Sequence, residues 1–507
     1  MGRQPITMAT KAKLNIYGGI VCQIITIICG IIVPRILLKE FGSGAYGATT
    51  SISQFLSYIT LLDGGVSSVA RAALYKPLAY NDTQQISDIL YEIKKFFRVI
   101  AYIFSGYVLI IAVFFKTISH LDIFDWGVTF LLVIAISIST FAQYFFGISK
   151  SILLQADQKT YLTNGINAVT TVLNAVFVVI LVAVHSNLII VKLVSSCVFI
   201  LRPIFMSIYV KKVYKPVKVS NKHTNALSQK WTSLGQHIAF FLHSNTDIVV
   251  LTIFGNLTLV AIYSVYNMVV NAIQNLTVQF TNGMESVMGK MLAKKETNRL
   301  QAFFSRYETM VSCVSVFLFS TALVMIQPFI KIYTRGINDA CYEQPVFGVL
   351  LILSAFLYCL RLPYHSIIIA AGHFKQTKFA SYGEAIVNIV LSIMLVNKIG
   401  LIGVAIGTIA ATLFRFLFYL FYLSRNLIMR NIAWAVKRIV INVFCGAAVY
   451  VLGSIIISNM QIDNYFSWGM GSAITVFLSG IITFLINLVF YKSDMVYLVK
   501  RFLLKRK

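Results

Sequence analysis

Long apolar segments alternate with short polar breaks along almost the whole chain. Each segment is continuous and about 18–25 residues long, which is the length that an α-helix needs to cross the hydrocarbon core of a bilayer. Strands of a membrane β-barrel would be about half as long and would alternate in polarity. The pattern predicts an all-α polytopic membrane protein with about fourteen transmembrane helices, at residues 14–38, 45–63, 97–115, 126–148, 162–184, 188–210, 232–254, 257–284, 309–327, 346–369, 381–397, 400–423, 438–458 and 467–491.

Composition and charge agree with this pattern. Of 507 residues, 58% are hydrophobic and only 12% are charged, whereas about 25% of a soluble domain is charged. This balance excludes a soluble enzyme. The net charge of +26 follows from 43 Lys and Arg against 17 Asp and Glu.

The basic residues also predict the orientation of the chain in the membrane. If both termini are cytoplasmic, the inner segments hold 33 of the 43 Lys and Arg residues and the outer loops hold six. Cytoplasmic loops carry such an excess of basic residues. Nearly all of the positive charge therefore reflects topology, and we expect no nucleic-acid partner.

The sequence contains no recognisable motif for catalysis, metal binding or nucleotide binding. The seven cysteines include no CxxC pair, and no GxxxxGK[ST] phosphate loop occurs. Neither a pair of catalytic carboxylates nor a Ser/His/Asp set can be recognised. We expect a carrier that is not an enzyme, with no catalytic residues, no metal and no cofactor.

The chain repeats itself at an offset of 213 positions. The segment LIIVKLVSSCVFILR (188–202) matches LIGVAIGTIAATLFR (401–415), and Tyr209 falls on Tyr422. The same offset places Phe41-Gly42 on Phe254-Gly255. Six predicted spans separate the copies, so both cross the membrane in the same direction.

This duplication predicts the domain organisation. Residues 1–212 and 213–425 form two parallel six-helix lobes, related by a pseudo-two-fold axis along the membrane normal, and 426–507 add two helices and a basic amphipathic tail. Paired six-helix lobes are typical of transporters that work by alternating access.

One segment near the start of the chain resembles a known family. PRILLKEFGSGAYGATTSISQFLSYITLLDGGVSSVARAALYKPLAYND (34–82) resembles the start of bacterial Wzx-type polysaccharide flippases, which share a superfamily with multidrug/cation antiporters and peptidoglycan-precursor flippases. The resemblance implies a plasma-membrane flippase for an undecaprenyl-pyrophosphate-linked oligosaccharide of O-antigen or capsule synthesis. It also implies membrane lipids, a polysaccharide polymerase and chain-length proteins as partners.

Several arginines are candidates for a cationic substrate cavity. A charge near the bilayer centre costs at least about 2.5–3.5 kcal/mol and should face protein or water. Arg361, Arg202 and Arg415 lie deep in predicted spans, whereas Arg35 and Arg71 lie near the outer and inner vestibules. A forked guanidinium matches phosphate oxygens. The structural alternative is that these side chains bond backbone carbonyls or anchor at the membrane surface.

A possible ion-coupling pair occupies the seventh predicted span. His243 and Asp247 are four residues apart, so they share a helix face and could exchange protons with a gradient. The alternative is a polar cavity lining with no coupling role.

Other polar and small residues in the predicted spans suggest structural roles. We expect Lys192 and Glu384, each four residues into a span, to reach the membrane surface. The glycines Gly400, Gly403 and Gly407 form a small-residue face for close helix packing.

Three rival functions remain open. A multidrug/cation antiporter needs carboxylates facing the lumen, but basic residues outnumber acids in these spans. A peptidoglycan-precursor flippase differs only in its substrate. A membrane glycosyltransferase or polymerase needs a large outer loop, and the longest one here (328–345) has about 18 residues.

Overall fold

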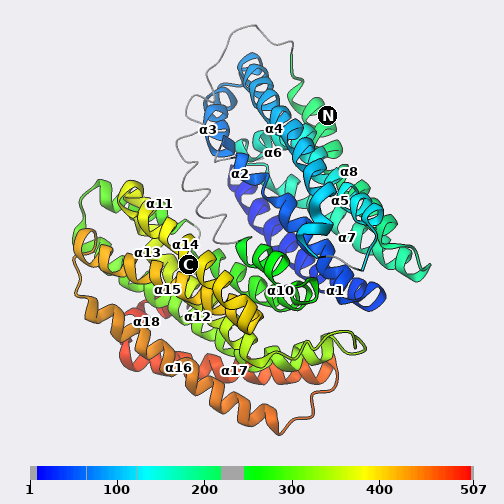
Figure 1. Ribbon diagram of the computed structural model, residues 1–507. Helices are drawn as coiled ribbons and strands as arrows, with labels where there is room; N and C mark the ends of the chain where they lie inside the picture. The colour runs from blue at the N-terminus through cyan, green and yellow to red at the C-terminus, as the bar shows by residue number, and fades with distance from the viewer. Residues whose placement is uncertain (1–7, 64–65, 121–122, 218–244, 282, 504–507) are drawn as a thin grey trace. The chain divides into compact units, whose positions relative to one another are not determined.

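The computed structural model describes residues 8–63, 66–120, 123–217, 245–281 and 283–503. All regular elements in these ranges are helices, which confirms the predicted all-α membrane fold. The chain forms two compact units, Met1–Ala261 and Ile262–Lys507 (Figure 1).

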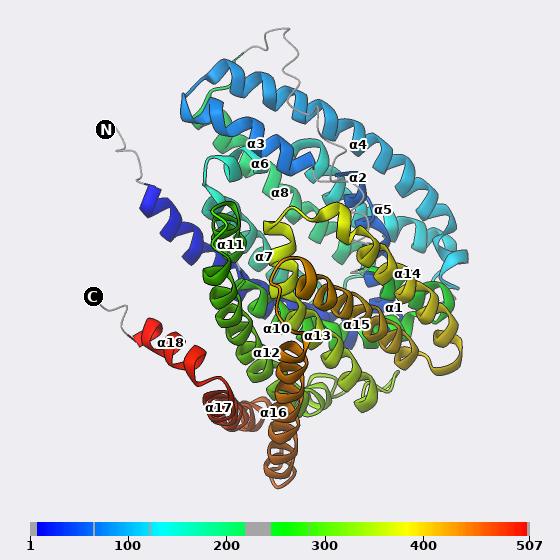
Figure 2. The same cartoon turned by 90° about the vertical axis from the view of Figure 1, so that its left-hand side faces the viewer.

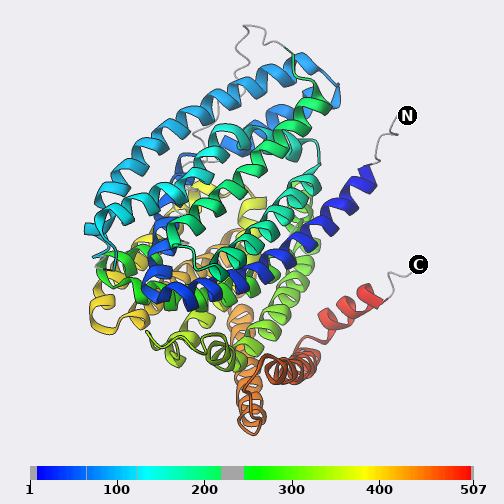
Figure 3. The same ribbon diagram turned by 90° about the vertical axis from the view of Figure 1, so that its right-hand side faces the viewer.

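Unit 1 is a bundle of long helices in which α1 packs along α7, and α5 and α7 both pack on α8 (Figure 3). A short π-helical turn, η1, interrupts the helix that continues from α5 into α6. The elements are α1 (Met8–Ser57), α2 (Thr60–Asp63), α3 (Val66–Ala79), α4 (Thr83–Ile118), α5 (Trp126–Ala142), η1 (Gln143–Gly147), α6 (Ile148–Ala156), α7 (Thr160–Ala183), α8 (Leu188–Tyr214) and the helix Asn245–Phe254.

Unit 2 is built around the long helix α12. Helices α13, α16, α17 and α18 all contact α12, and α14 packs along α15 (Figure 2). The elements from this part of the chain are α10 (Leu257–Gln279), α11 (Met284–Ala293), α12 (Thr297–Tyr333), α13 (Pro345–Ala370), α14 (Phe374–Ile399), α15 (Leu401–Asn426), α16 (Ile432–Ser458), α17 (Tyr465–Phe490) and α18 (Lys492–Leu503).

Twelve helices among the described residues are long and apolar enough to cross a membrane. The prediction of about fourteen differs at two places. Predicted spans 14–38 and 45–63 lie in one continuous apolar stretch, Lys13–Asp63, which counts once. Predicted span 232–254 lies mainly outside the described residues, and its end forms the helix Asn245–Phe254.

The long helix α1 is two helical segments joined at a kink. Gly42 adopts φ 81° and ψ 170° there, in the region that glycine tolerates without a steric penalty. The kink falls between the first two predicted spans. A single glycine therefore separates two apolar segments that the hydropathy pattern distinguishes.

The internal repeat is visible in matching helix pairs. Helices α7 and α8 of unit 1 pack together, as do α14 and α15 of unit 2. The first residues of α8 and α15, Leu188 and Leu401, are separated by the 213 positions of the sequence repeat.

Close packing of α14 on α15 depends on small residues, as predicted. A Cβ atom at Gly403 would lie 2.6 Å from the carbonyl carbon of Leu395, and one at Gly407 would lie 2.4 Å from Ser392 Oγ. Gly400 adopts φ 56° in the turn between the helices. This contact fixes α14 against α15, and each of these helices contributes a residue to a buried ionic cluster.

Candidate functional site

A buried cluster of two arginines and one glutamate joins three helices of unit 2. Glu384 of α14 accepts hydrogen bonds from Arg361 of α13 and from Arg415 of α15, one on each carboxylate oxygen. Glu384 is 0% exposed, Arg361 4% and Arg415 5%. We call these three residues the triad. It carries a net charge of +1 in the interior of the unit.

Aromatic side chains surround the triad. Arg415 Nε donates to the Tyr419 hydroxyl at 2.9 Å, and the Arg361 guanidinium lies 5.0 Å from the Tyr358 ring. Tyr419 in turn stacks on His365 at a centroid distance of 6.0 Å. Such rings stabilise a cation through their negative faces.

The position of Glu384 corrects the expectation that it reaches the membrane surface. The predicted span begins at residue 381, but α14 begins at Phe374, ten residues before Glu384. At 1.5 Å per residue, this places Glu384 about 15 Å along the helix. The carboxylate is therefore deep enough to meet both arginines.

Arg202 of unit 1 makes the corresponding contact in the other copy of the repeat. Its Nε donates to Thr170 Oγ1 at 2.8 Å, and its Nη2 donates to Thr171 Oγ1 at 3.1 Å. Its guanidinium lies 4.2 Å from the Phe199 ring. Among the described residues, Arg202 forms no ion pair, so its charge is not neutralised by a carboxylate.

The other two candidate arginines lie on separate helices of unit 1. Arg71 of α3 donates to Gln155 Oε1 of α6 at 2.9 Å. Arg35 lies half-buried in α1, directly after Pro34. The structure thus brings Arg361 and Arg415 together, and holds Arg202, Arg71 and Arg35 on α8, α3 and α1.

The candidate ion-coupling pair is only partly described. Asp247 is 8% exposed and lies on the helix Asn245–Phe254, while His243 lies outside the described residues. Gln54 of α1 donates to Asn245 at 2.7 Å, and Ser51 lies 2.7 Å from Thr252. Polar residues of the second predicted span, at the end of α1, therefore bind this helix.

A second buried ionic cluster, which the sequence pattern did not indicate, lies in unit 2. Glu308 of α12 pairs with Arg438 of α16 and with Arg430, both at 2.9 Å, and also accepts from the Tyr364 hydroxyl. Asp494 of α18 accepts from two hydroxyls of α12. The cluster attaches α16 and α18 to α12. Its signal in the sequence is the acidic Glu308 at the edge of an apolar segment.

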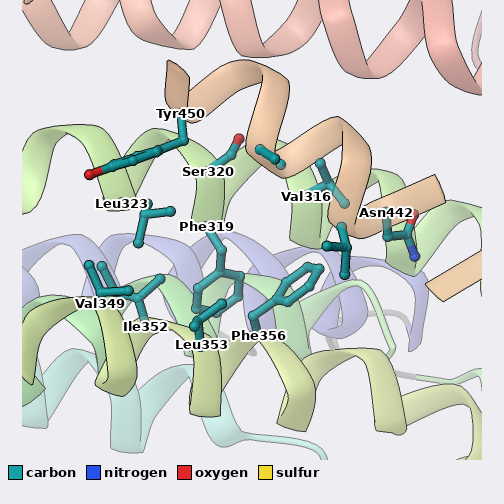
Figure 4. A pocket seen from close by; sticks show the side chains of 13 residues that line it. Val316, Phe319, Ser320, Leu323, Val349, Ile352, Leu353, Phe356, Asn442 and Tyr450 are labelled. Carbon is teal, nitrogen blue, oxygen red and sulfur yellow. The ribbon is translucent and has the colours of Figure 1, made fainter. Parts of the chain in front are cut away.

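An apolar groove of about 310 Å³ lies among α12, α13 and α16 (Figure 4). Side chains such as Phe319, Leu353 and Phe356 form its walls, while Asn442 and Tyr450 bring polar atoms to it. Phe356 precedes Arg361 in α13 by five residues, which is about 7.5 Å along the helix. An apolar surface and a buried cationic cluster therefore share one helix.

No group of three His, Cys, Asp or Glu side chains that could hold a metal ion occurs in the part of the chain that the structure describes. The two charge clusters instead combine guanidinium, carboxylate and phenol groups. These groups can bind an anion or reorganise as ion pairs.

Membrane-length helices in two units, with ionic clusters inside them, define the fold of a polytopic all-α membrane protein. No family model and no curated protein matches the chain. The lipid II flippase MurJ, in an inward closed conformation, matches with a TM-score of 0.72 at 14% identity, over 94% of this chain and 99% of that chain.

Two multidrug transporters show the same fold. An inward-facing MATE family transporter of the MOP superfamily has a TM-score of 0.61 at 12% identity, over 78% of this chain and 94% of that chain. The MATE multidrug transporter DinF-BH, in a ligand complex, has a TM-score of 0.58 at 17% identity, over 85% of this chain and 99% of that chain. The chain therefore shares its fold with these solved MurJ and MATE structures.

Proposed function

We propose that the protein is a flippase for an undecaprenyl-pyrophosphate-linked oligosaccharide, a repeat unit of a bacterial polysaccharide such as O-antigen or capsule. It carries this substrate from the inner to the outer leaflet of the plasma membrane by alternating access and performs no chemistry on it. Both termini lie in the cytoplasm in this proposal, as the distribution of basic residues predicts.

The observation that carries the proposal is the excess of guanidinium over carboxylate inside the spans. Arg361 and Arg415 share one carboxylate, and each keeps N–H donors beyond the one given to Glu384. A pyrophosphate or an acidic sugar accepts such forked donors in pairs. Because both arginines are buried, a movement of α13, α14 and α15 during alternating access would expose them.

The apolar groove supports a lipid-linked substrate. A polyprenyl tail requires an apolar surface continuous with lipid, and the groove among α12, α13 and α16 supplies one in the same unit as the triad. Its walls would hold part of the tail while the charged head binds arginine.

The test is reconstitution of the purified protein into vesicles with a fluorescent polyprenyl-pyrophosphate oligosaccharide, followed by chemical quenching of the outer leaflet. We expect protein-dependent movement of the label between leaflets. In cells, deletion of the gene should cause one lipid-linked glycan to accumulate on the inner leaflet. Absence of both effects would refute the proposal.

A multidrug/cation antiporter is the second candidate, because the buried Asp247 could bind a cation and the MATE fold is shared. This function predicts retention of cationic dyes in the deletion strain with no accumulated glycan. Accumulation of a peptidoglycan precursor in the deletion strain would instead identify the protein as a peptidoglycan-precursor flippase. The lipid extract and the dye assay together separate these outcomes.

A further inference from the structure

A second cavity, of about 250 Å³ and partly open to the outside, lies among α1, α5, α7 and α8 of unit 1. Its walls combine aliphatic side chains with seven polar or charged ones, but none of its lining residues is acidic. Lys192 of α8 lines this cavity. Lys192 is partly exposed and lies four residues after the start of α8, so its reaching the outer membrane surface stays a prediction.

Four polar side chains of the cavity have no protein partner. Within the residues that the structure describes, the side chains of Thr140, Asn174, Lys192 and Ser195 make no hydrogen bond or ion pair, and Asn174 Oδ1 is buried without one. Ser196, by contrast, donates to the Ala135 carbonyl at 2.6 Å. Of these polar atoms, Asn174 Oδ1 is buried, whereas the side chain of Lys192 is partly exposed. A buried polar atom without a protein partner usually binds water or a ligand.

The backbone beside the cavity is irregular. The π-helical turn η1 begins at Gln143, whose N–H bonds the carbonyls of Ser139 and Thr140. Single π-turns inside α-helices are frequent at functional sites. The π-helical turn directly follows the end of α5, and this end of α5 supplies Thr140 to the cavity.

An ammonium group inside the bilayer is costly without a counter-charge. The cavity supplies donors around Lys192 but no carboxylate, so the missing partner is an anion. We propose that this cavity binds one monovalent anion of halide type, held by the Lys192 ammonium and the side chains of Asn174, Thr140 and Ser195.

The chemistry favours a monovalent anion over a phosphate. One lysine balances one negative charge, while a phosphate dianion would leave a second charge buried. The volume exceeds that of a halide, so water can share the cavity and donate to Asn174 Oδ1, since a water needs only about 30 Å³ of liquid volume. The site is independent of the proposed substrate, because it rests on unit 1 residues other than the candidate arginines.

The experiment measures equilibrium binding of radiolabelled chloride to the purified full-length protein in sodium gluconate buffer. We expect saturable binding at one site per chain, competed by bromide. Lys192→Met should abolish it, whereas Lys398→Met, at an exposed lysine near the end of α14, should not change it. Asn174→Ala should weaken binding about tenfold, as expected for loss of one hydrogen bond to a charged group.

A thermal-stability measurement separates a lost site from a misfolded protein. In gluconate, Lys192→Met should unfold at the same temperature as the wild type or higher, because it removes a partly buried charge that has no carboxylate partner among the residues that the structure describes. Chloride should raise the Tm of the wild type and of Lys398→Met but leave that of Lys192→Met unchanged. Chloride binding that survives Lys192→Met, or no saturable binding by the wild type, would overturn the proposal. The second result would indicate a neutral amine in a water-filled cavity.

Discussion

Thr171 and Glu384 occupy equivalent positions in the two copies of the internal repeat, and each accepts a hydrogen bond from the arginine 31 positions further along the chain. Arg202 donates to Thr171, and Arg415 donates to Glu384. The contact is the same, but only the second copy contains a carboxylate. Among the described residues, Arg202 has no carboxylate partner, whereas Arg415 shares the carboxylate of Glu384 with Arg361.

This relationship predicts the effect of giving the first copy a carboxylate. Thr171→Glu should place a negative charge beside Arg202 and neutralise it. If Arg202 binds the anionic substrate, transport in the vesicle assay should fall at least about tenfold, which corresponds to about 1.4 kcal/mol, while the thermal stability stays equal or rises.

The matched control for this charge is Thr171→Gln, which resembles the glutamate in size but carries no charge. We expect it to retain most of the transport. Full transport by Thr171→Glu, at a normal protein level, would show that the Arg202 charge has no part in substrate binding.

The triad predicts that stability and transport can be separated. Glu384→Gln should leave two buried guanidiniums without a counter-charge, and loss of one partner from a buried ionic cluster costs about 3–5 kcal/mol. We therefore expect a large fall in Tm in detergent. Replacing Arg361, Glu384 and Arg415 together by Met should recover much of it, because an apolar cluster of similar volume needs no counter-ion.

Transport by the triple variant then tests the role of the arginines. A stable triple variant that no longer moves the labelled lipid supports substrate binding by Arg361 and Arg415. A stable triple variant with normal transport would restrict the triad to holding α13, α14 and α15 together.

The contact of α14 with α15 predicts a steric effect at Gly403. Gly403→Ala places a Cβ atom 2.6 Å from the Leu395 carbonyl carbon, so the helices must separate. Overpacking of this kind costs about 1–3 kcal/mol. The control is Gly106→Ala in α4, where no atom lies within 4 Å of the added Cβ and alanine favours the helix. Equal Tm values for the two variants would contradict the packing argument.

Two kinds of feature could be predicted from the sequence: the helices, which depend on local hydropathy, and the equivalent positions of the internal repeat. Hydropathy identified the helices, and the repeat placed Arg202 and Arg415 at equivalent positions. The partners of these arginines could not be predicted, because they depend on which helix faces meet. Glu384 was assigned to the surface since hydropathy set the start of its span seven residues after the true start of α14.

Arg438 shows why a charge pattern does not predict the partner of a basic side chain. Arg438 fits the charge pattern of a cytoplasmic loop, yet it is buried and paired with Glu308 of α12, 130 positions earlier in the chain. Charge statistics cannot distinguish a surface anchor from a long-range ion pair. The cavity lined by Lys192 could not be predicted for a related reason, since residues of four separate helices form it.

A final prediction concerns pH and the ionic cluster at Asp157, between α6 and α7. Asp157 contacts Lys159 at 2.6 Å, Tyr214 at 2.5 Å and Lys11 at 3.0 Å. Burial raises the pKa of its carboxyl, but the hydrogen bonds from these groups outweigh burial and hold the pKa below its ordinary value of 3.8. A carboxyl with a depressed folded pKa stabilises the protein above its unfolded pKa and loses that contribution as the pH falls through the folded value.

Replacing this carboxylate by an amide should therefore destabilise the protein only where the carboxylate is charged. Asp157→Asn should lower the Tm by about 2–4 °C at neutral pH. This difference from the wild type should stay constant down to about pH 5 and shrink below about pH 4. Asp125→Asn, at an exposed helix cap without a side-chain hydrogen bond, should match the wild type throughout. A Tm difference for Asp157→Asn that persists unchanged at the lowest pH would show that the carboxylate charge is not the source of the stability.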